Sequence, residues 1–110
     1  MKVKIKKHQY KIIECGKDDE LFYKDNELLR YGQCDYVNQT IKIFKDIPYP
    51  RKRETLMHEL THAFLNSYLE SFHIKDKYDQ EDICCFVSCY SEEIIEITNK
   101  YFKKKEQNRE

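Results

Sequence analysis

The chain has 110 residues, of which 40% are hydrophobic and 36% are charged, which is typical of one folded globular domain rather than a disordered segment. Its 20 Lys and Arg residues balance 20 Asp and Glu residues, so no net field attracts nucleic acid or an anionic membrane. Residues 1–7 lack the apolar stretch of a secretory signal, and no run approaches the roughly 18 apolar residues of a membrane span. We therefore expect a cytoplasmic protein.

The first half of the chain predicts β-strands. Residues 3–6 alternate in polarity, and residues 10–14 are rich in β-branched and aromatic side chains. A hairpin follows, in which strands over 29–36 and 40–44 flank a turn at 37–39. Because residues 40–44 alternate strictly, one face of that strand should be buried.

Two helices are expected after the Pro48-Tyr49-Pro50 boundary. Residues 51–68 have a helical period, with one apolar stripe formed by Leu56, Leu60, Ala63, Phe64 and Ser67. Residues 80–102 predict a second helix with Ile83, Phe86, Val87, Tyr90, Ile94, Ile97 and Tyr101 as its apolar set. Strands followed by helices indicate one α+β domain over residues 1–102. Residues 103–110 are all polar and are expected to form a frayed, solubilising tail.

Five cysteines occur in the sequence, namely Cys15, Cys34, Cys84, Cys85 and Cys89. An odd number without an export signal predicts reduced thiols. No two of them have the C-x2-C spacing of a zinc knuckle. We expect them to be small apolar fillers of the core.

The segment His58-Glu59-Leu60-Thr61-His62 carries the strongest chemical signal in the chain. Positions four apart on a helix are neighbours, so two imidazoles can point at one metal ion. Glu59 flanks that ion, where a base acting on a metal-bound water is needed. A shuffled chain of this composition would contain the pattern about 0.015 times. The core stripe lies on the other side of the helix, so the two histidines should face a cleft.

Catalytic zinc sites use three protein ligands and leave one position for water. Glu81, at the start of the second helix, is the preferred third ligand, and Asp82 is the alternative one position away. His8 and His73 are the other histidines, and neither is as well placed. Glu81 could instead only complement the dipole of the second helix.

The helix face that follows Glu81 carries Cys84, Cys85, Ser88 and Glu92. Three of these side chains are small and would let the two helices approach closely near the ion. Cys85 lies one turn after Glu81, where it could contact a histidine ligand. A direct metal-binding or redox role for Cys85 is the less favoured interpretation.

The residues 55–65 around the motif, together with 81–87, resemble the short phage and mobile-element zinc metallopeptidases of the ImmA/IrrE type, which are minimal gluzincins. The likeness extends over residues 30–102 and includes the hairpin Gly32-Gln33-Cys34-Asp35-Tyr36. It implies a small N-terminal antiparallel twisted sheet packed on two C-terminal helices. It also implies Zn²⁺ on His58, His62 and a glutamate of the second helix, with Glu59 catalytic. Larger relatives cleave a transcriptional repressor, so a repressor is a possible substrate.

The resulting hypothesis is metal-assisted hydrolysis of a peptide bond, with Glu59 as general base. An extended substrate would add along an edge strand, for which residues 40–44 are the candidate. Tyr90, Tyr78 or His73 could stabilise the oxyanion, although Tyr90 lies on an apolar face. The alternative function is a zinc-stabilised protein that blocks a host or phage factor by stoichiometric contact. Lys103-Lys104-Lys105 is too short to indicate a nucleic-acid-binding protein.

Overall fold

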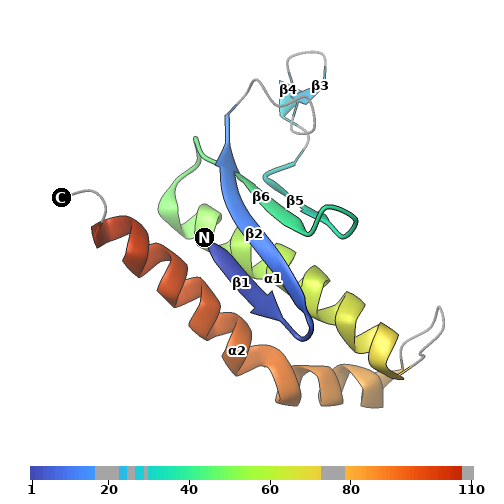
Figure 1. Ribbon diagram of the computed structural model, residues 1–110. Helices are drawn as coiled ribbons and strands as arrows, with labels where there is room; N and C mark the ends of the chain where they lie inside the picture. Colours follow the sequence, from blue (N-terminus) through green and yellow to red (C-terminus); the bar gives the residue numbers. More distant parts are fainter. Residues whose placement is uncertain (17–22, 25–26, 29, 73–78, 108–110) are drawn as a thin grey trace.

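Figure 1 shows the chain as a computed structural model, which describes residues 1–16, 23–24, 27–28, 30–72 and 79–107. Strands come first and helices follow, which confirms the expected α+β class. The strands are β1 (Lys2–Ile5), β2 (His8–Cys15), β3 (Tyr23–Lys24), β4 (Glu27–Leu28), β5 (Gly32–Asp35) and β6 (Thr40–Phe44). The helices are α1 (Tyr49–Phe72) and α2 (Gln80–Gln107).

The main sheet has the strand order β1-β2-β6-β5, and β3 pairs separately with β4. Both hairpins, β1–β2 and β5–β6, are antiparallel, whereas β2 and β6 run parallel. The sheet is therefore mixed rather than wholly antiparallel. The reason is that β5 begins at the end of the sheet where β2 finishes. Because β6 is antiparallel to β5, it points in the same direction as β2 (Figure 1).

The position of β6 corrects one prediction. Thr40–Phe44 pairs with β2 on one side and β5 on the other, so it is an inner strand and not an edge. Within the described residues, β1 and β5 form the two edges of this sheet. The alternation of β6 is confirmed, since Ile41 and Ile43 are fully buried.

The predicted turn between β5 and β6 is present at residues 36–39. Asp35 Oδ1 accepts hydrogen bonds from the backbone N–H groups of Val37 (3.1 Å) and Asn38 (3.0 Å). These two bonds, with Asn38 as the main cause, hold the pKa of the Asp35 carboxyl below its usual value. The side chain of Asp35 thus sets where β5 ends and β6 begins.

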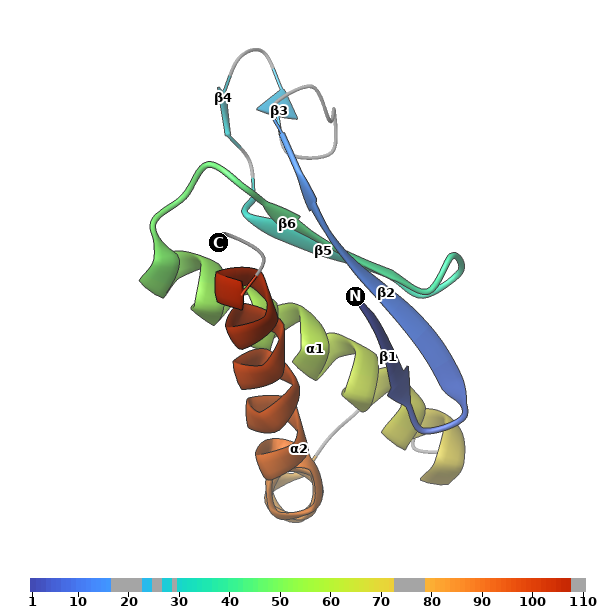
Figure 2. The same cartoon turned by 60° about the vertical axis from the view of Figure 1, so that its left-hand side comes forward.

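Helix α1 lies across one face of the sheet against β5 and β6, and α2 runs beside α1 (Figures 1 and 2). Pro50 occupies the first turn of α1, where its missing N–H costs nothing. The predicted stripe of α1 is buried as expected, with Leu56, Leu60 and Ala63 at 0% exposure. These side chains join Ile41 and Ile43 in one apolar core.

Helix α2 departs from its prediction at both ends. Ile83 is 56% exposed and Val87 is 51% exposed, because the first turns of α2 contact α1 mainly through Phe86 and Tyr90. At the other end the helix continues to Gln107, so residues 103–107 are helical and not frayed.

The cysteine prediction is correct for the thiol state and wrong for burial. All five cysteines are free, but Cys84, Cys85 and Cys89 are exposed on α2, and Cys15 and Cys34 are half-buried. Ser88 and Glu92 are exposed as well. The predicted small-residue face of α2 therefore points to solvent, because aromatic side chains rather than small ones fill the contact with α1.

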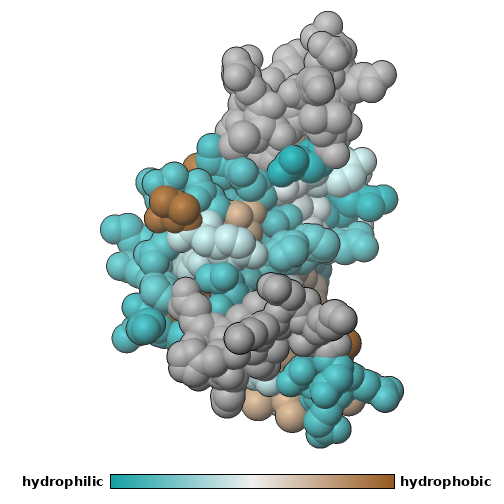
Figure 3. Space-filling model, turned by 90° about the vertical axis from the view of Figure 1, so that its right-hand side faces the viewer, coloured by the Kyte–Doolittle hydropathy of each residue, from teal (hydrophilic) through white to brown (hydrophobic). Residues whose placement is uncertain are grey.

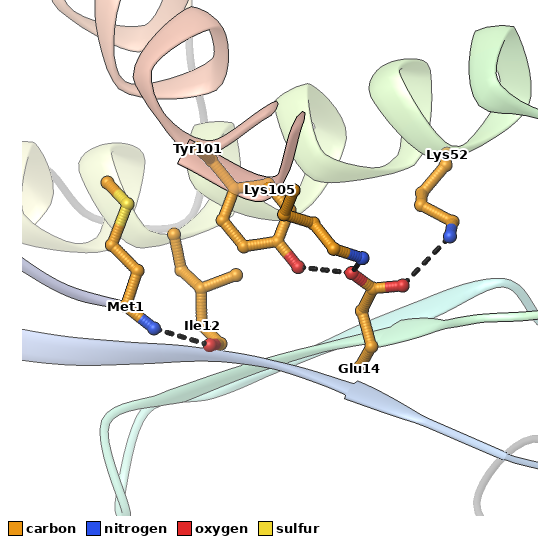
Figure 4. A network of polar contacts seen from close by, with 6 residues as sticks. All are labelled: Met1, Ile12, Glu14, Lys52, Tyr101 and Lys105. Carbon is orange, nitrogen blue, oxygen red and sulfur yellow. Dashed lines mark hydrogen bonds and ion pairs between the residues drawn. The ribbon is translucent and has the colours of Figure 1, made fainter. Parts of the chain in front are cut away.

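A polar network fastens the C-terminal half of α2 to the sheet and to α1 (Figure 4). The carboxylate of Glu14 in β2 accepts hydrogen bonds from Lys52 Nζ (2.8 Å) and from the Tyr101 hydroxyl (2.6 Å). It also forms an ion pair with Lys105. The side chains of Glu14 and Lys52 are each only 13% exposed. This contact explains why the helix extends through Lys105.

We expect Glu14→Ala to lower the free energy of unfolding by about 2 kcal/mol, because two cations and a hydroxyl lose a shared, mostly buried acceptor. Glu14→Gln should cost less, since an amide oxygen still accepts. Glu54→Ala is the control: its contact with Arg51 is exposed and 3.9 Å long, so its effect should stay within about 0.5 kcal/mol. Urea denaturation of the three variants measures these differences. Equal effects of Glu14→Ala and Glu54→Ala would contradict the prediction.

Among the described residues seen in Figure 3, hydrophilic side chains predominate and hydrophobic ones occur in separate spots. Of the large apolar side chains that the structure describes, Val37 is the most exposed at 91%, in the β5–β6 turn. Among the described residues, neither helix combines the length and the hydropathy that crossing a membrane requires.

Candidate metal centre

Helix α1 brings His58, Glu59 and His62 together on the side that faces β5. Each residue offers one possible ligand atom, and these three atoms all lie within 4.8 Å of one another. The two imidazole rings have centroids 4.9 Å apart and planes inclined by 72°. This proximity follows from their spacing of one helical turn.

The three residues could hold a metal ion, and the spacing of the two imidazoles can be compared with that of a zinc site. In a tetrahedral site, imidazole nitrogens at about 2.0–2.1 Å from zinc lie about 3.3 Å from each other. Ligand atoms already within 4.8 Å can close to that separation by small side-chain rotations, which the exposed rings of His58 and His62 permit. Glu59 is only 7% exposed and therefore has less freedom to move.

These side chains form part of the wall of a pocket of about 540 Å³ between α1 and β5. From α1 the pocket is lined by Arg51, Glu54, Thr55, His58, Glu59 and His62. From β5 and the residues beside it, the lining consists of Arg30, Tyr31, Gly32, Gln33, Cys34 and Tyr36. The metal group therefore opens onto a space large enough for a segment of another molecule.

Gly32 allows β5 to come close to the helix at this point. A Cβ atom on Gly32 would lie 2.7 Å from Thr55 Cγ2 and 3.0 Å from Glu59 Cγ. The first separation is shorter than real Cβ contacts, and the second is tighter than nine in ten of them. The absence of a side chain at Gly32 thus lets the strand backbone pack directly against the stem of Glu59, which fixes where the carboxylate lies.

Burial controls the protonation of the two acidic groups inside the pocket. It raises the pKa of the Glu59 carboxyl, and the nearby charges of His58, His62 and Arg30 oppose that rise. Burial likewise raises the pKa of the Cys34 thiol to about 12, with smaller contributions from Glu59 and Asp35. Cys34 is therefore a neutral thiol at physiological pH, while Glu59 is closer to the range in which a carboxylate can exchange protons.

Because the pKa of the Glu59 carboxyl is raised, we expect the stability of the metal-free protein to depend on pH. A buried carboxyl whose folded-state pKa lies above its ordinary value of 4.5 favours folding when it is protonated, and this advantage is lost as the pH rises through the folded-state pKa. In metal-free buffer at pH 7 we expect Glu59→Gln to be more stable than wild type by about 1 kcal/mol, because it carries no buried charge. At pH 4 the difference should disappear. Thermal unfolding at both pH values measures it, and an equal gain at both would contradict the assigned cause.

The comparisons with known proteins give no relative. No family model matches the chain, and neither does a curated protein or a solved structure. The geometry of the site and its residue types are therefore what support a metal centre here.

The predicted third ligand, Glu81, is not brought to the two histidines. Among the described residues, the group that could share one ion consists of His58, Glu59 and His62. Glu81 is exposed in the first turn of α2. Tyr90 of α2 packs on Phe64 with ring centroids 5.6 Å apart, and Glu81 precedes Tyr90 by nine residues, about 14 Å along the helix.

The side of α1 on which α2 packs also separates Glu81 from the histidines. Helix α2 packs on the side of α1 that carries Phe64 and Tyr68. That side lies about 120° around the helix axis from His58 and His62. The alternative ligand, Asp82, caps α2 instead: its backbone N–H donates to Asp79 Oδ1 (2.8 Å), and its Oδ2 accepts from the Asp79 N–H (3.2 Å). This reciprocal pair is a capping box.

The other residues considered from the sequence lie away from the centre or outside the described residues. Tyr90 is 6% exposed in the core and does not line the pocket. Cys85 is exposed on α2, where burial and the charge of Glu81 raise the pKa of its thiol. His8 contacts Gln39 Nε2 through its Nδ1 at 2.9 Å. His73 and Tyr78 lie outside the described residues.

Sequence reasoning gave no role in the centre to several residues that line the pocket, among them Arg30, Tyr31, Cys34 and Arg51. No spacing rule connects Arg30, Tyr31 and Cys34 to the histidine motif, since β5 and the residues beside it meet α1 only through folding, whereas Arg51 lies about two helical turns before His58. One signal was available. A lone glycine inside a predicted strand, as at Gly32, often marks a close backbone approach.

Proposed function

We propose that this chain is a zinc-dependent endopeptidase whose active centre is the pocket between α1 and β5. The observation that carries the proposal is the cluster of two exposed imidazoles and one buried carboxylate at the wall of that pocket. A solvated helix face explains two exposed histidines, but it does not explain why Glu59 is 7% exposed beside them. Burying an acid is costly, and such a group is a candidate for chemical function.

His58 and His62 would hold the metal. When bound there, Zn²⁺ would polarise a water molecule and the scissile carbonyl, and so make the water acidic near neutral pH. Glu59 would take a proton from that water and pass it to the nitrogen of the leaving amine. Its raised pKa supports this role, because a proton carrier works best when its pKa approaches the working pH.

A segment of a protein substrate would lie extended beside β5. This strand pairs with β6 and forms an edge of the described sheet, so it is the strand available for backbone pairing next to the metal group. A transcriptional repressor is the narrower substrate proposal, and it comes from the resemblance to ImmA/IrrE-type peptidases alone.

Glu81 stays a prediction as the third protein ligand, because a catalytic zinc site needs one. Its role would require the first turn of α2 to approach the histidine side of α1. Zinc titrations of Glu81→Gln and Asp82→Asn decide this point. A weaker affinity in Glu81→Gln alone would support Glu81, and unchanged affinity in both would exclude both acids.

Metal binding and cleavage together test the proposal. We expect the purified chain to bind one Zn²⁺ and to cleave an unfolded protein such as reduced casein in a zinc-dependent, chelator-sensitive way. His62→Ala should lose both properties, since it removes one of two imidazole ligands. His8→Ala is the matched control, because His8 lies outside the pocket, and it should retain both. Elemental analysis and gel assays provide the measurements.

The amount of protein needed separates the two functions considered. A peptidase acts well below stoichiometry and produces fragments. A protein that blocks its target by contact needs one copy per target and leaves the target intact. Zinc binding without any fragment, over a panel of unfolded proteins and peptides, would refute the peptidase and favour the blocking protein.

A further inference from the structure

Two arginines, Arg30 and Arg51, line the pocket that holds the metal group. Arg51 belongs to the first turns of α1, and its guanidinium carbon lies 5.4 Å from the ring centroid of Tyr31. Arg30 precedes Tyr31 in the chain, and all three residues line the pocket. The aromatic contact limits the orientations that the Arg51 guanidinium can take.

The guanidinium of Arg51 has donors to offer a ligand. Its ion pair with Glu54 is 3.9 Å long, which exceeds hydrogen-bond length, and the two side chains are 55% and 74% exposed. An exposed pair of this length is weak. Since an arginine has five N–H donors, an arriving carboxylate could bind in the bidentate way and displace or join Glu54.

The positions of the arginines relative to the metal group define a register. Arg51 precedes His58 by seven residues on one helix, about 10 Å along the axis. An extended peptide covers that length with about three residues. Arg30 lines the same pocket as the metal group and adds a second positive charge to it.

We infer that Arg51, supported by Arg30, selects substrates with an aspartate or glutamate about three residues to one side of the scissile bond. This inference rests on the proposed peptidase function and names its substrate class. The acidic side chain would lie over the Tyr31 end of the pocket and pair with the guanidinium of Arg51 while the backbone follows β5 past the metal group.

A position scan tests the inference. One peptide that the enzyme cleaves is remade with a single Glu, and separately a single Lys, at each of four positions on either side of the bond. We expect kcat/KM to be about tenfold higher for Glu than for Lys at one position, about three residues away and on one side only. A flat profile, or a preference for Lys, would overturn the inference.

Three variants show which side chain is responsible. Arg51→Glu should reverse the Glu-over-Lys ratio at that position, and Arg51→Gln should reduce it towards one. Glu54→Gln removes the competing carboxylate and should increase the ratio. The control Arg53→Glu makes the same charge change two residues further along α1, outside the pocket lining, and should leave the ratio as in wild type. Ratios unaffected by the Arg51 substitutions would reject Arg51 as the selecting residue.

Binding measurements separate this inference from the proposed function. The zinc-loaded Glu59→Gln variant is titrated with fluorescently labelled extended peptides that carry a single Glu or a single Lys at each position in turn. If wild type cleaves no peptide but Glu peptides bind about tenfold more tightly than Lys peptides, the proposed peptidase function is refuted and the selectivity for an acidic side chain is supported. If peptides are cleaved without any charge preference in rate or binding, the peptidase stands and the selectivity fails. Absence of both cleavage and charge-dependent binding overturns both.

Discussion

Glu59→Gln is expected to reduce peptide hydrolysis by about 10²–10⁴-fold, the usual contribution of a positioned general base, while the variant still binds one Zn²⁺. The amide keeps the size of the side chain and its place against Gly32, but it cannot take a proton from water. Zinc affinity should be retained because His58 and His62, which can hold the ion, are unchanged. Cleavage rates at saturating zinc, together with zinc stoichiometry, measure the two effects separately.

A matched control is Glu93→Gln, which makes the same substitution at an exposed position of α2. It should have wild-type activity and metal content. Two outcomes for Glu59→Gln would contradict the mechanism. Cleavage at the wild-type rate would mean that another group removes the proton. Loss of zinc would mean that Glu59 is itself a metal ligand. Its carboxylate lies within 4.8 Å of the histidine ligand atoms, so the zinc stoichiometry has to distinguish a ligand from a general base.

Gly32→Ala is expected to lower the free energy of unfolding by about 2 kcal/mol, the usual cost of overpacking, and the melting temperature by about 10 °C. The new methyl group would meet Thr55 Cγ2 at 2.7 Å, Glu59 Cγ at 3.0 Å and the Lys42 carbonyl oxygen at 3.1 Å. The carbonyl belongs to the central strand β6 and cannot move freely. Strand β5 must therefore shift away from α1, and Glu59 should lose its position, so activity should fall as well.

Gly16→Ala provides the control for this substitution. There the added carbon would meet Lys45 Cε at 3.1 Å and Lys45 Nζ at 3.5 Å, which are the far end of a flexible side chain. The lysine can move aside, so the change in stability should stay within about 0.5 kcal/mol. Calorimetry of both variants gives the comparison. Equal melting temperatures for the two would show that β5 and α1 are not held in close contact.

Local patterns in the chain were sufficient to predict the elements that carry the centre. The strict alternation at residues 40–44 and the apolar stripe through Leu56 and Leu60 correspond to β6 and to the buried side of α1. The proximity of His58 to His62 follows from one turn of helix and needs no tertiary contact. Helical geometry also places these rings away from the core stripe.

Predictions that depended on how one element approaches another were less successful. Glu81 was assigned to the centre on the assumption that α2 folds back onto the histidine side of α1. The aromatic contacts of Phe64 and Tyr68 with Tyr90 and Phe86 hold α2 on a different side. Residues 40–44 were assigned to a sheet edge because a hairpin pattern does not show which of its strands pairs with a third one.

The amino-acid sequence was enough to predict the α+β order and the pair of histidines that, with the acid beside them, could hold a metal ion, because these depend on periodicity and spacing along the chain. Folding was required to show that Glu59 is buried, that β5 rather than β6 borders the pocket, and that Arg30 and Arg51 reach the same space. Burial and pocket walls arise from contacts between segments far apart in the chain. The energy of such contacts depends on how whole faces fit together, and no local pattern contains that information.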